Sequence, residues 1–195
     1  MVLSASMAGV FSIAELSTIE EILDGQRTAV VEIADKLWRE AELGYLENVS
    51  SMVLGDYLTA NGFSIERRSA GLPTAFVASA GSGSPVIGIL AEFDALPGMS
   101  QAASPKREIL ADEAAGHACG HNLFGAASVA AAVGLAKSLA IGERSGTVRV
   151  YGTPAEEGGP AVPETANCGD AVFVGSAVAG TLVPIMTPTA AYPAS

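Results

Sequence analysis

Apolar and polar residues alternate along this 195-residue chain with two different periods, and the change of period predicts its elements. In residues 17–40 and 51–61 the apolar side chains recur every three or four positions, as on one face of an amphipathic helix. Ser17 and Glu20 have the spacing of a capping box at the start of the first helix, and Gly25 indicates a break within it. Two helices are therefore expected in the first third of the chain.

Shorter runs of apolar residues follow these helices and are typical of strands. Residues 63–67 alternate between apolar and polar, and residues 74–78 are short and apolar. The run from Val86 to Ala91 is apolar throughout, as in a central strand that is covered on both faces. Residues 147–152 alternate again. Four strands are predicted from these patterns.

The stretch from Leu123 to Ile141 is apolar almost all round, which indicates a helix buried against a sheet. Lys137 interrupts this stretch, and for this reason we expect no membrane span. Residues 101–115 are polar and irregular and predict a surface loop. The alternation of helices and strands predicts an α/β fold, a three-layer sandwich with a mixed, mostly parallel sheet.

Composition and charge restrict the classes of function. Acidic residues outnumber basic ones by 21 to 10, and the net charge of −11 argues against nucleic acid or an anionic membrane as a partner. Cys119 and Cys168 are too few for a disulfide framework, and the N-terminus lacks the basic region of a secretory signal. We expect a cytoplasmic protein whose partners are small molecules or cations.

Side chains of the types that bind metals fall at the ends of predicted strands and at the start of the predicted buried helix. In open α/β sheets, these loops and helix N-termini form the ligand crevice. The side chains that would meet there are Glu92, Asp94, Cys119, His121, Glu156 and Glu157. Such a set of carboxylates, a thiol and an imidazole would repel one another unless a divalent cation lay among them. One glutamate of the adjacent pair could bind that ion while the other takes a proton from a bound water molecule.

Each of these signals also has a plainer interpretation. A cysteine near a glycine is usually a small buried apolar residue, and a single C-x-H spacing is weaker than the paired cysteines of structural zinc sites. Adjacent glutamates after a strand are most often solvated, and His117 is interpreted as a turn residue or a neighbour of the ligands. A thiol hydrolase, with Cys119 as nucleophile and His117 or His121 as base, would leave the carboxylates without a role.

Five ordered stretches resemble the metal-dependent amidohydrolases of the aminoacylase and carboxypeptidase superfamily. From Leu37 to Gly159 they are LWREAELGYLE, GLPTAFVA, PVIGILAEFDALPGMSQ, GHACGHNLFGAAS and VYGTPAEEGG. The branch they resemble is peptidase family M20, subfamily D, which includes the aminobenzoyl-glutamate, hippurate and auxin-conjugate hydrolases. Asn122 after the second histidine is similar to the aminobenzoyl-glutamate hydrolase group. Five motifs in order are far more specific than any one of them.

The resemblance implies a site and its chemistry. Cys119, His121 and Glu157 would be metal ligands. Glu156 would be the general base and acid, and Asp94 a catalytic carboxylate that supports the site. The implied cofactor is Zn or Mn, with Co as a third candidate, and the implied reaction is hydrolysis of the amide bond in an N-acyl or N-aroyl amino acid or a dipeptide-like molecule. Full-length relatives are expected to be homodimers.

Beyond the last of these stretches the chain departs from the family pattern. The family continues with a strand that ends in His-Pro, whereas here Thr187 precedes Pro188, and no histidine follows His121. Residues 1–159 are therefore expected to be the N-terminal part of the catalytic domain, without the dimerisation domain, and residues 160–195 a divergent tail, non-native or frame-shifted. We expect weak activity or none; the alternative is a non-catalytic fragment that acts only through association with another chain.

Overall fold

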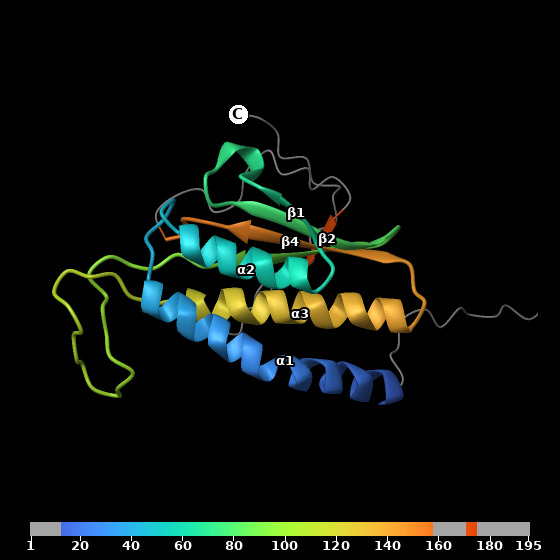
Figure 1. Cartoon of the computed structure of the whole chain (residues 1–195), viewed down its shortest axis with the longest axis horizontal. Coiled ribbons are helices and arrows are strands. Elements are labelled where there is room, and N and C mark those ends of the chain that lie inside the picture. Colours follow the sequence, from blue (N-terminus) through green and yellow to red (C-terminus); the bar gives the residue numbers. More distant parts are fainter. Residues whose placement is uncertain (1–12, 158–170, 175–195) are drawn as a thin grey trace, which may run out of the picture.

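The computed structural model describes residues 13–157 and 171–174 (Figure 1). In this part of the chain, three helices lie against one five-stranded sheet. The helices are α1 (Ile13–Glu40), α2 (Asn48–Ala60) and α3 (His121–Ile141). The strands are β1 (Ser64–Arg67), β2 (Phe76–Ser82), β3 (Val86–Glu92), β4 (Gly146–Thr153) and β5 (Ala171–Val174). A 3-10 turn at Ser69–Gly71 joins β1 to β2, and the loop predicted at residues 101–115 has no helix or strand.

The strand order is β1-β2-β4-β3-β5. β2 pairs antiparallel with both β1 and β4, and β3 pairs parallel with both β4 and β5. The parallel pair β3 and β4 is joined through α3, because parallel neighbours need a long crossover connection. The α/β class and the mixed sheet are thus confirmed. The described sheet is more evenly mixed than the mostly parallel sheet that we predicted.

The three described helices lie on the same face of the sheet (Figure 1). α2 and α3 pack directly on the strands, and α1 packs on α3 and α2. Within the described ranges, no helix covers the other face, where the further layer of a three-layer sandwich would lie. β5 falls inside the predicted tail and extends the sheet beside β3. Cys168, Thr187 and Pro188, on which other predictions for the tail depend, lie outside the described residues.

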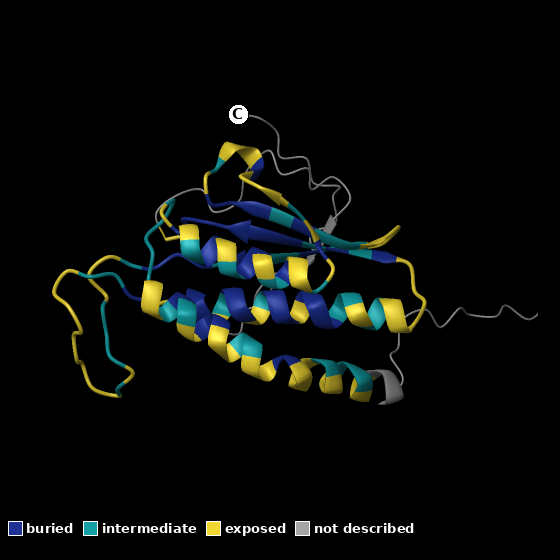
Figure 2. Cartoon of the chain, viewed as in Figure 1, coloured by how far each residue is buried: buried dark blue, intermediate teal, exposed yellow. Residues whose placement is uncertain are grey.

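The hydrophobic core lies between the sheet and the helices (Figure 2). Phe76 of β2 and Phe93, directly after β3, stack with ring centroids 6.1 Å apart, and each is at most 1% exposed. Leu37 of α1 and Leu54 of α2 are fully buried from the helix side. Because these residues come from four segments, the core fixes where β3 ends and therefore where the polar residues after it begin.

α3 is long and apolar enough to cross a membrane by length and composition alone. Our reason for discounting this stretch, its interruption by Lys137, was therefore wrong. The packing of α3 explains its composition instead, since it lies between α1 and the sheet and buries Val129, Ala132 and Val133 completely. A helix in contact with neighbours on two sides needs apolar residues over most of its circumference.

The helix starts differ from those that the sequence predicts. Ser17, Glu20 and Gly25 all lie inside α1, so the capping box and the break are not formed. α2 begins at Asn48, because the carboxylate of Glu42 accepts hydrogen bonds from the N–H groups of Val49 and Ser50, at 3.0 and 2.8 Å. This cap comes from seven and eight residues away and therefore has no local sequence signature.

Two glycines inside helices should respond in opposite ways to replacement by alanine. A Cβ at residue 125 of α3 would lie 2.8 Å from the carbonyl oxygen of Glu92, whereas a Cβ at residue 25 of α1 would meet nothing within 4 Å. We expect Gly125→Ala to destabilise the protein by about 1–3 kcal/mol through overpacking. Gly25→Ala should stabilise it by about 0.5–1 kcal/mol, because glycine is the poorer helix former. Urea unfolding followed by circular dichroism measures both, and equal effects of the two substitutions would contradict the packing of α3 on β3.

Candidate metal centre

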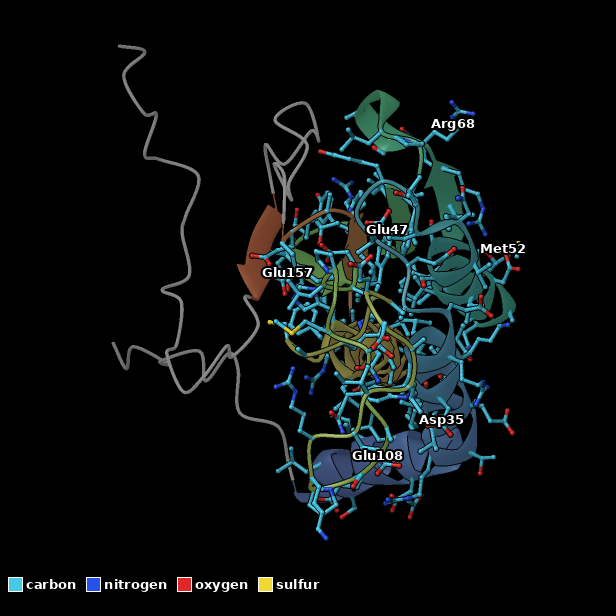
Figure 3. All side chains as sticks on the ribbon, turned by 90° about the vertical axis from the view of Figure 1, so that its left-hand side faces the viewer. Asp35, Glu47, Met52, Arg68, Glu108 and Glu157 are labelled. Carbon is cyan, nitrogen blue, oxygen red and sulfur yellow. The ribbon has the colours of Figure 1, made fainter. Side chains whose placement is uncertain are left out.

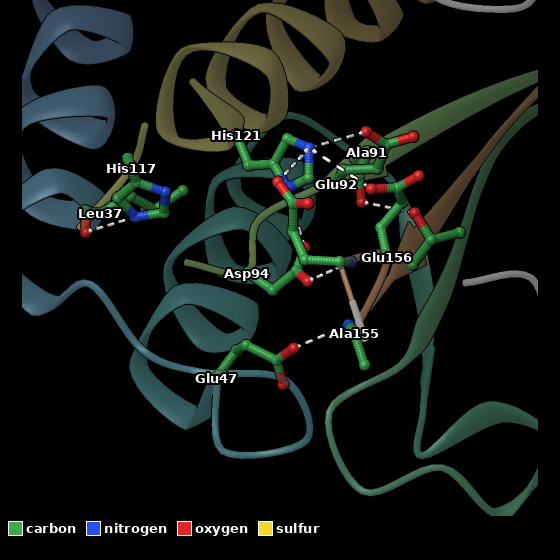
Figure 4. Close-up of polar contacts among 11 residues, drawn as sticks. Leu37, Glu47, Ala91, Glu92, Asp94, His117, His121, Ala155 and Glu156 are labelled. Atoms are coloured by element: carbon green, nitrogen blue, oxygen red, sulfur yellow. Dashed lines mark hydrogen bonds and ion pairs between the residues drawn. The ribbon is translucent and has the colours of Figure 1, made fainter. Parts of the chain in front are cut away.

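Four of the polar residues singled out in the sequence, Glu92, Asp94, His121 and Glu156, meet at one end of the sheet (Figure 4). Cys119 and Glu157 offer donor atoms within 4.8 Å of His121. β3 ends at Glu92 and β4 at Thr153, and because the two strands are parallel, their carboxyl ends lie side by side. Glu92 and Thr153 are themselves partners in the register. α3 begins at His121 over the same edge. The predicted convergence of loop and helix start is therefore observed.

His121 lies at the centre of this group and is 4% exposed. Its Nδ1 is 2.8 Å from Oδ1 of Asp94, which fixes the orientation of the ring. Its Nε2 faces three further carboxylates, those of Glu92 at 3.2 Å, Glu156 at 3.8 Å and Glu157 at 3.9 Å. The hydrogen bonds and charges of these carboxylates outweigh the effect of burial and raise the pKa of His121 above its ordinary value.

Asp94 connects the histidine to the loop after β4. It is 2% exposed, and while one carboxylate oxygen contacts His121, the other accepts the N–H of Glu157 at 2.9 Å. Burial alone would raise the pKa of Asp94, but the hydrogen bonds from His121 and Glu157 outweigh it and lower this pKa. Asp94 is therefore an ionised carboxylate that holds two other site residues in place.

Two sets of donor atoms are close enough together to hold an ion. In the first set, Cys119, His121 and Glu157 each offer an atom within 4.8 Å of the others; in the second, Glu92, His121 and Glu156 do so. Ligand distances of roughly 2.0–2.3 Å place the donors of one zinc ion no more than roughly 4.6 Å apart. The first set contains the three metal ligands that the resemblance implies. Its thiol, imidazole and carboxylate fit a Zn, Mn or Co ion with only a small approach of the donors.

The electrostatics of the group are those of a cation site. Among the described residues, no lysine or arginine forms an ion pair with Glu92, Asp94, Glu156 or Glu157. Burial raises the pKa of Glu92, despite the nearby imidazole, and the other carboxylates raise it further. Cys119 is exposed, but partial desolvation, and then the carboxylates led by Glu157, raise the pKa of its thiol. Among the described residues, His121 is thus the one basic side chain that faces this accumulation of negative charge.

The second histidine of the GHACGHN stretch does not join the donor sets. His117 is 5% exposed, and its Nε2 contacts the carbonyl oxygen of Leu37 at 3.0 Å, on the α1 side (Figure 4). Burial lowers the pKa of His117, so the ring is neutral. Asn122 likewise points toward α1 and donates to the carbonyl oxygen of Ala34 at 3.3 Å. The interpretation of His117 as a neighbour of the ligands agrees with this position.

Sequence reasoning gave no role to two carboxylates that the structure places at or beside the site. Glu92 was grouped with Asp94 only by position, although side chains two residues apart at a strand end can share a face. The two-residue spacing of Glu92 and Asp94 was the signal in the sequence that could have identified Glu92 as a site residue. Glu47 is 0% exposed and contacts the N–H of Ala155, which is 108 positions further along the chain. Nothing local in the sequence indicates this contact.

Comparison with solved structures identifies the class of protein that this fold and site define. A dinuclear metal binding peptidase of the M20 family from Bacillus subtilis superposes with a TM-score of 0.57 and 28% identity, over 69% of this chain and 36% of that one. No family model matches the sequence. The chain is similar to the M20 peptidases in fold and in sequence.

Curated relatives make the similarity more particular. The chain is 41% identical over 142 residues to a subunit of the p-aminobenzoyl-glutamate hydrolase of Escherichia coli strain K12, and the match covers 72% of this chain and 30% of that protein. It is 32% identical over 168 residues to the Xaa-Arg dipeptidase of Mus musculus, covering 77% of this chain and 35% of that protein. The resemblance to the aminobenzoyl-glutamate hydrolase group is confirmed. The chain spans about a third of the length of these relatives.

Proposed function

We propose that the chain supplies part of the catalytic site of a metal-dependent amidohydrolase that acts on N-acyl or N-aroyl amino acids. The observation that carries this proposal is the convergence of Cys119, His121 and Glu157, whose donor atoms lie within 4.8 Å of one another. The carboxylates beside them form no ion pair with a lysine or arginine of the described residues. The identity to the p-aminobenzoyl-glutamate hydrolase of Escherichia coli supports the class of substrate. Because the match covers only 30% and 35% of these relatives, the activity of the chain by itself is expected to be weak or absent.

The resemblance implies the roles of the residues, and their positions support these roles. A divalent ion bound by Cys119, His121 and Glu157 would lower the pKa of a water molecule and polarise an amide carbonyl. Glu156 has a side chain that is 41% exposed and lies 3.8 Å from His121, so it can reach both solvent and substrate. It is the group placed to accept a proton from the attacking water and return it to the leaving nitrogen. Asp94 keeps the His121 ring in position and is a supporting carboxylate.

A hollow beside the centre supports an apolar acyl or aroyl group as one half of the substrate. It has a volume of about 270 Å³ and lies between the loop after α1 and the loops after β3 and β4. Leu43, Tyr45 and Pro97 provide apolar and aromatic surface, and Asp94 and Glu157 lie at the metal-centre side. None of the described residues that line this hollow is basic, so an uncharged acyl or aroyl group fits it better than a carboxylate group of the substrate would.

The thiol-hydrolase alternative is disfavoured by the surroundings of Cys119. A thiol nucleophile needs a lowered pKa or an adjacent base. Here partial desolvation and the nearby carboxylates raise the pKa of the exposed Cys119 thiol. The His117 ring forms its hydrogen bond with the carbonyl oxygen of Leu37. Asp94 orients His121 through Nδ1, but the Nε2 atom faces the carboxylates of Glu92, Glu156 and Glu157. A thiol mechanism would leave these carboxylates without a role, whereas a metal ion uses them.

The test of the proposal is the metal content of the protein purified without chelator. We expect bound Zn, Mn or Co in the wild-type chain, and its loss in Cys119→Ala and in Glu157→Ala. Glu156→Gln should retain the metal, because this residue is assigned to proton transfer, and should lose any hydrolysis of N-acyl amino acids. Metal analysis by mass spectrometry and an amine-release assay measure the two properties.

Two other outcomes would favour the alternatives. A metal-free wild-type chain whose hydrolysis is inhibited by iodoacetamide would favour the thiol enzyme. A metal-free, inactive chain that associates with another chain would favour the non-catalytic fragment.

A further inference from the structure

A buried carboxylate lies beneath the loop that carries the two glutamates of the site. Glu47, directly before α2, is 0% exposed and lies in the interior of the molecule (Figure 3). Its Oε1 accepts the N–H of Ala155 at 2.9 Å, and its Oε2 accepts the hydroxyl of Thr74 at 2.7 Å. One side chain thus connects the loop before α2, the segment before β2 and the loop after β4.

Glu47 has no cationic partner among the described residues. Burial raises its pKa, and hydrogen bonds from Thr74 and from the backbone N–H groups of Glu47, Ala155 and Tyr45 oppose this rise. A carboxylate without a counter-ion is costly to bury and is kept only where donors surround it. If an apolar side chain replaced Glu47, the N–H groups that donate to its carboxylate would lose their acceptor. Its presence therefore requires an explanation beyond core packing.

The donor that Glu47 engages lies next to the site. Ala155 directly precedes Glu156 and has a φ of 58°, in the left-handed region that alanine rarely adopts. Gly44 lies against it, since a Cβ at residue 44 would come within 2.8 Å of the Ala155 Cβ. Two residues further on, the N–H of Glu157 is held by Asp94. Buried carboxylates therefore hold this turn at both ends, in a backbone conformation that it would not adopt by itself.

We propose that Glu47 is a positioning residue of the metal centre, which holds the turn at Ala155 so that Glu156 and Glu157 face His121. The inference rests on the proposed function for its consequence, metal affinity, but the positioning itself is a property of the metal-free chain. Without an acceptor at residue 47, the Ala155 N–H would be left unpaired and the turn could relax toward ordinary dihedral angles. The carboxylate of Glu157 would then spend less time close enough to Cys119 and His121 to bind the same ion.

The first measurement is amide hydrogen exchange by NMR in the metal-free protein. Glu47→Met has a similar volume but no strong acceptor, and we expect exchange at Ala155 and Glu157 to become at least about tenfold faster. Glu47→Gln keeps an acceptor oxygen and should recover part of this protection. The matched control is Glu42→Met, which removes the carboxylate that caps α2 but does not contact the turn. It should leave exchange at both amides as in the wild type.

The second measurement is the affinity for Zn²⁺ and Mn²⁺ by isothermal titration. Residues that position ligands typically change metal affinity by about 10- to 100-fold when replaced, and we expect a loss in this range for Glu47→Met. Glu42→Met should bind metal as the wild type does, even where its melting temperature falls equally. A purely structural role of Glu47 would lower the melting temperatures of both variants and leave both affinities unchanged.

The outcomes separate this inference from the proposed function. If the wild-type chain binds no metal, the proposed function fails, and hydrogen exchange still decides whether Glu47 positions the turn. Unchanged exchange at Ala155 and Glu157 in Glu47→Met, or equal acceleration in Glu42→Met, would overturn the inference. If Glu47→Met does not fold, Thr74→Val decides in its place, because it removes the other side-chain partner of the carboxylate. Faster exchange at Ala155 in that variant supports the inference, and wild-type exchange overturns it.

Discussion

Replacing His121 by alanine should remove stable metal binding by the chain. His121 belongs to both donor sets and is the residue that three carboxylates approach through its Nε2. Its loss leaves acidic groups and a thiol whose mutual repulsion opposes a compact site. We expect the affinity for Zn²⁺ to fall by more than about 100-fold, beyond the range typical of residues outside the ligand set. Metal content after dialysis and isothermal titration provide the measurement.

The chain offers a matched control in its other histidine. His117→Ala removes a buried imidazole only four positions away, with a hydrogen bond to Leu37 but no place in either donor set. It should lose stability and keep the wild-type metal stoichiometry. The assignment would be contradicted if His121→Ala bound metal as the wild type does. An equal loss of metal from both variants would show that the fold of the segment, rather than the donor, is what matters.

The second large effect is expected in the core, where Phe93→Ala should destabilise the protein by about 3–5 kcal/mol. Phe93 is fully buried and stacks on Phe76, and it lies between Glu92 and Asp94 in the chain. Its removal would leave a cavity in the core, next to the segment that carries Glu92 and Asp94. Denaturant unfolding monitored by circular dichroism measures the loss, and we expect weaker metal binding in the same variant because the two carboxylates lose their support.

Two control substitutions test this prediction. Phe93→Leu keeps most of the apolar volume and should cost less than about 1.5 kcal/mol. Leu46→Ala changes a side chain that is 61% exposed and should lie within about 0.5 kcal/mol of the wild type. A Phe93→Ala variant as stable as Leu46→Ala would mean that the stacked phenylalanines do not form the core of the sheet.

Much of the fold is predictable because its elements have local causes. The apolar period of residues 51–61 predicts α2, and the continuous apolar run at β3 predicts a central strand. The boundaries were less predictable, because distant side chains set them. α2 starts three residues earlier than predicted because Glu42 caps it, and α1 continues through Gly25 as one helix that packs on α3 and α2.

The candidate site is predictable from the sequence only in part, because it depends both on the types of its residues and on their positions in the fold. The sequence by itself determined which side chains have the chemistry to bind a metal, and the order of the motifs predicted a site that includes Cys119, His121, Glu156 and Glu157. These depend on chemistry that is present in each residue and on segments that end at strand or helix termini. Glu92 has the same chemistry, but its role depends on its distance to the His121 Nε2, which only the packing of α3 on β3 sets.

The tertiary structure alone decided how the site is held. Glu47 and Ala155 are 108 positions apart, and Asp94 meets the Glu157 N–H across 63 positions. A hydrogen bond of this kind leaves no periodic trace in the sequence, since it depends on where three loops meet over the folded sheet. Local pattern therefore determined the elements and the candidate ligands, whereas the geometry that turns them into one centre was decided by the packing of segments far apart in the chain.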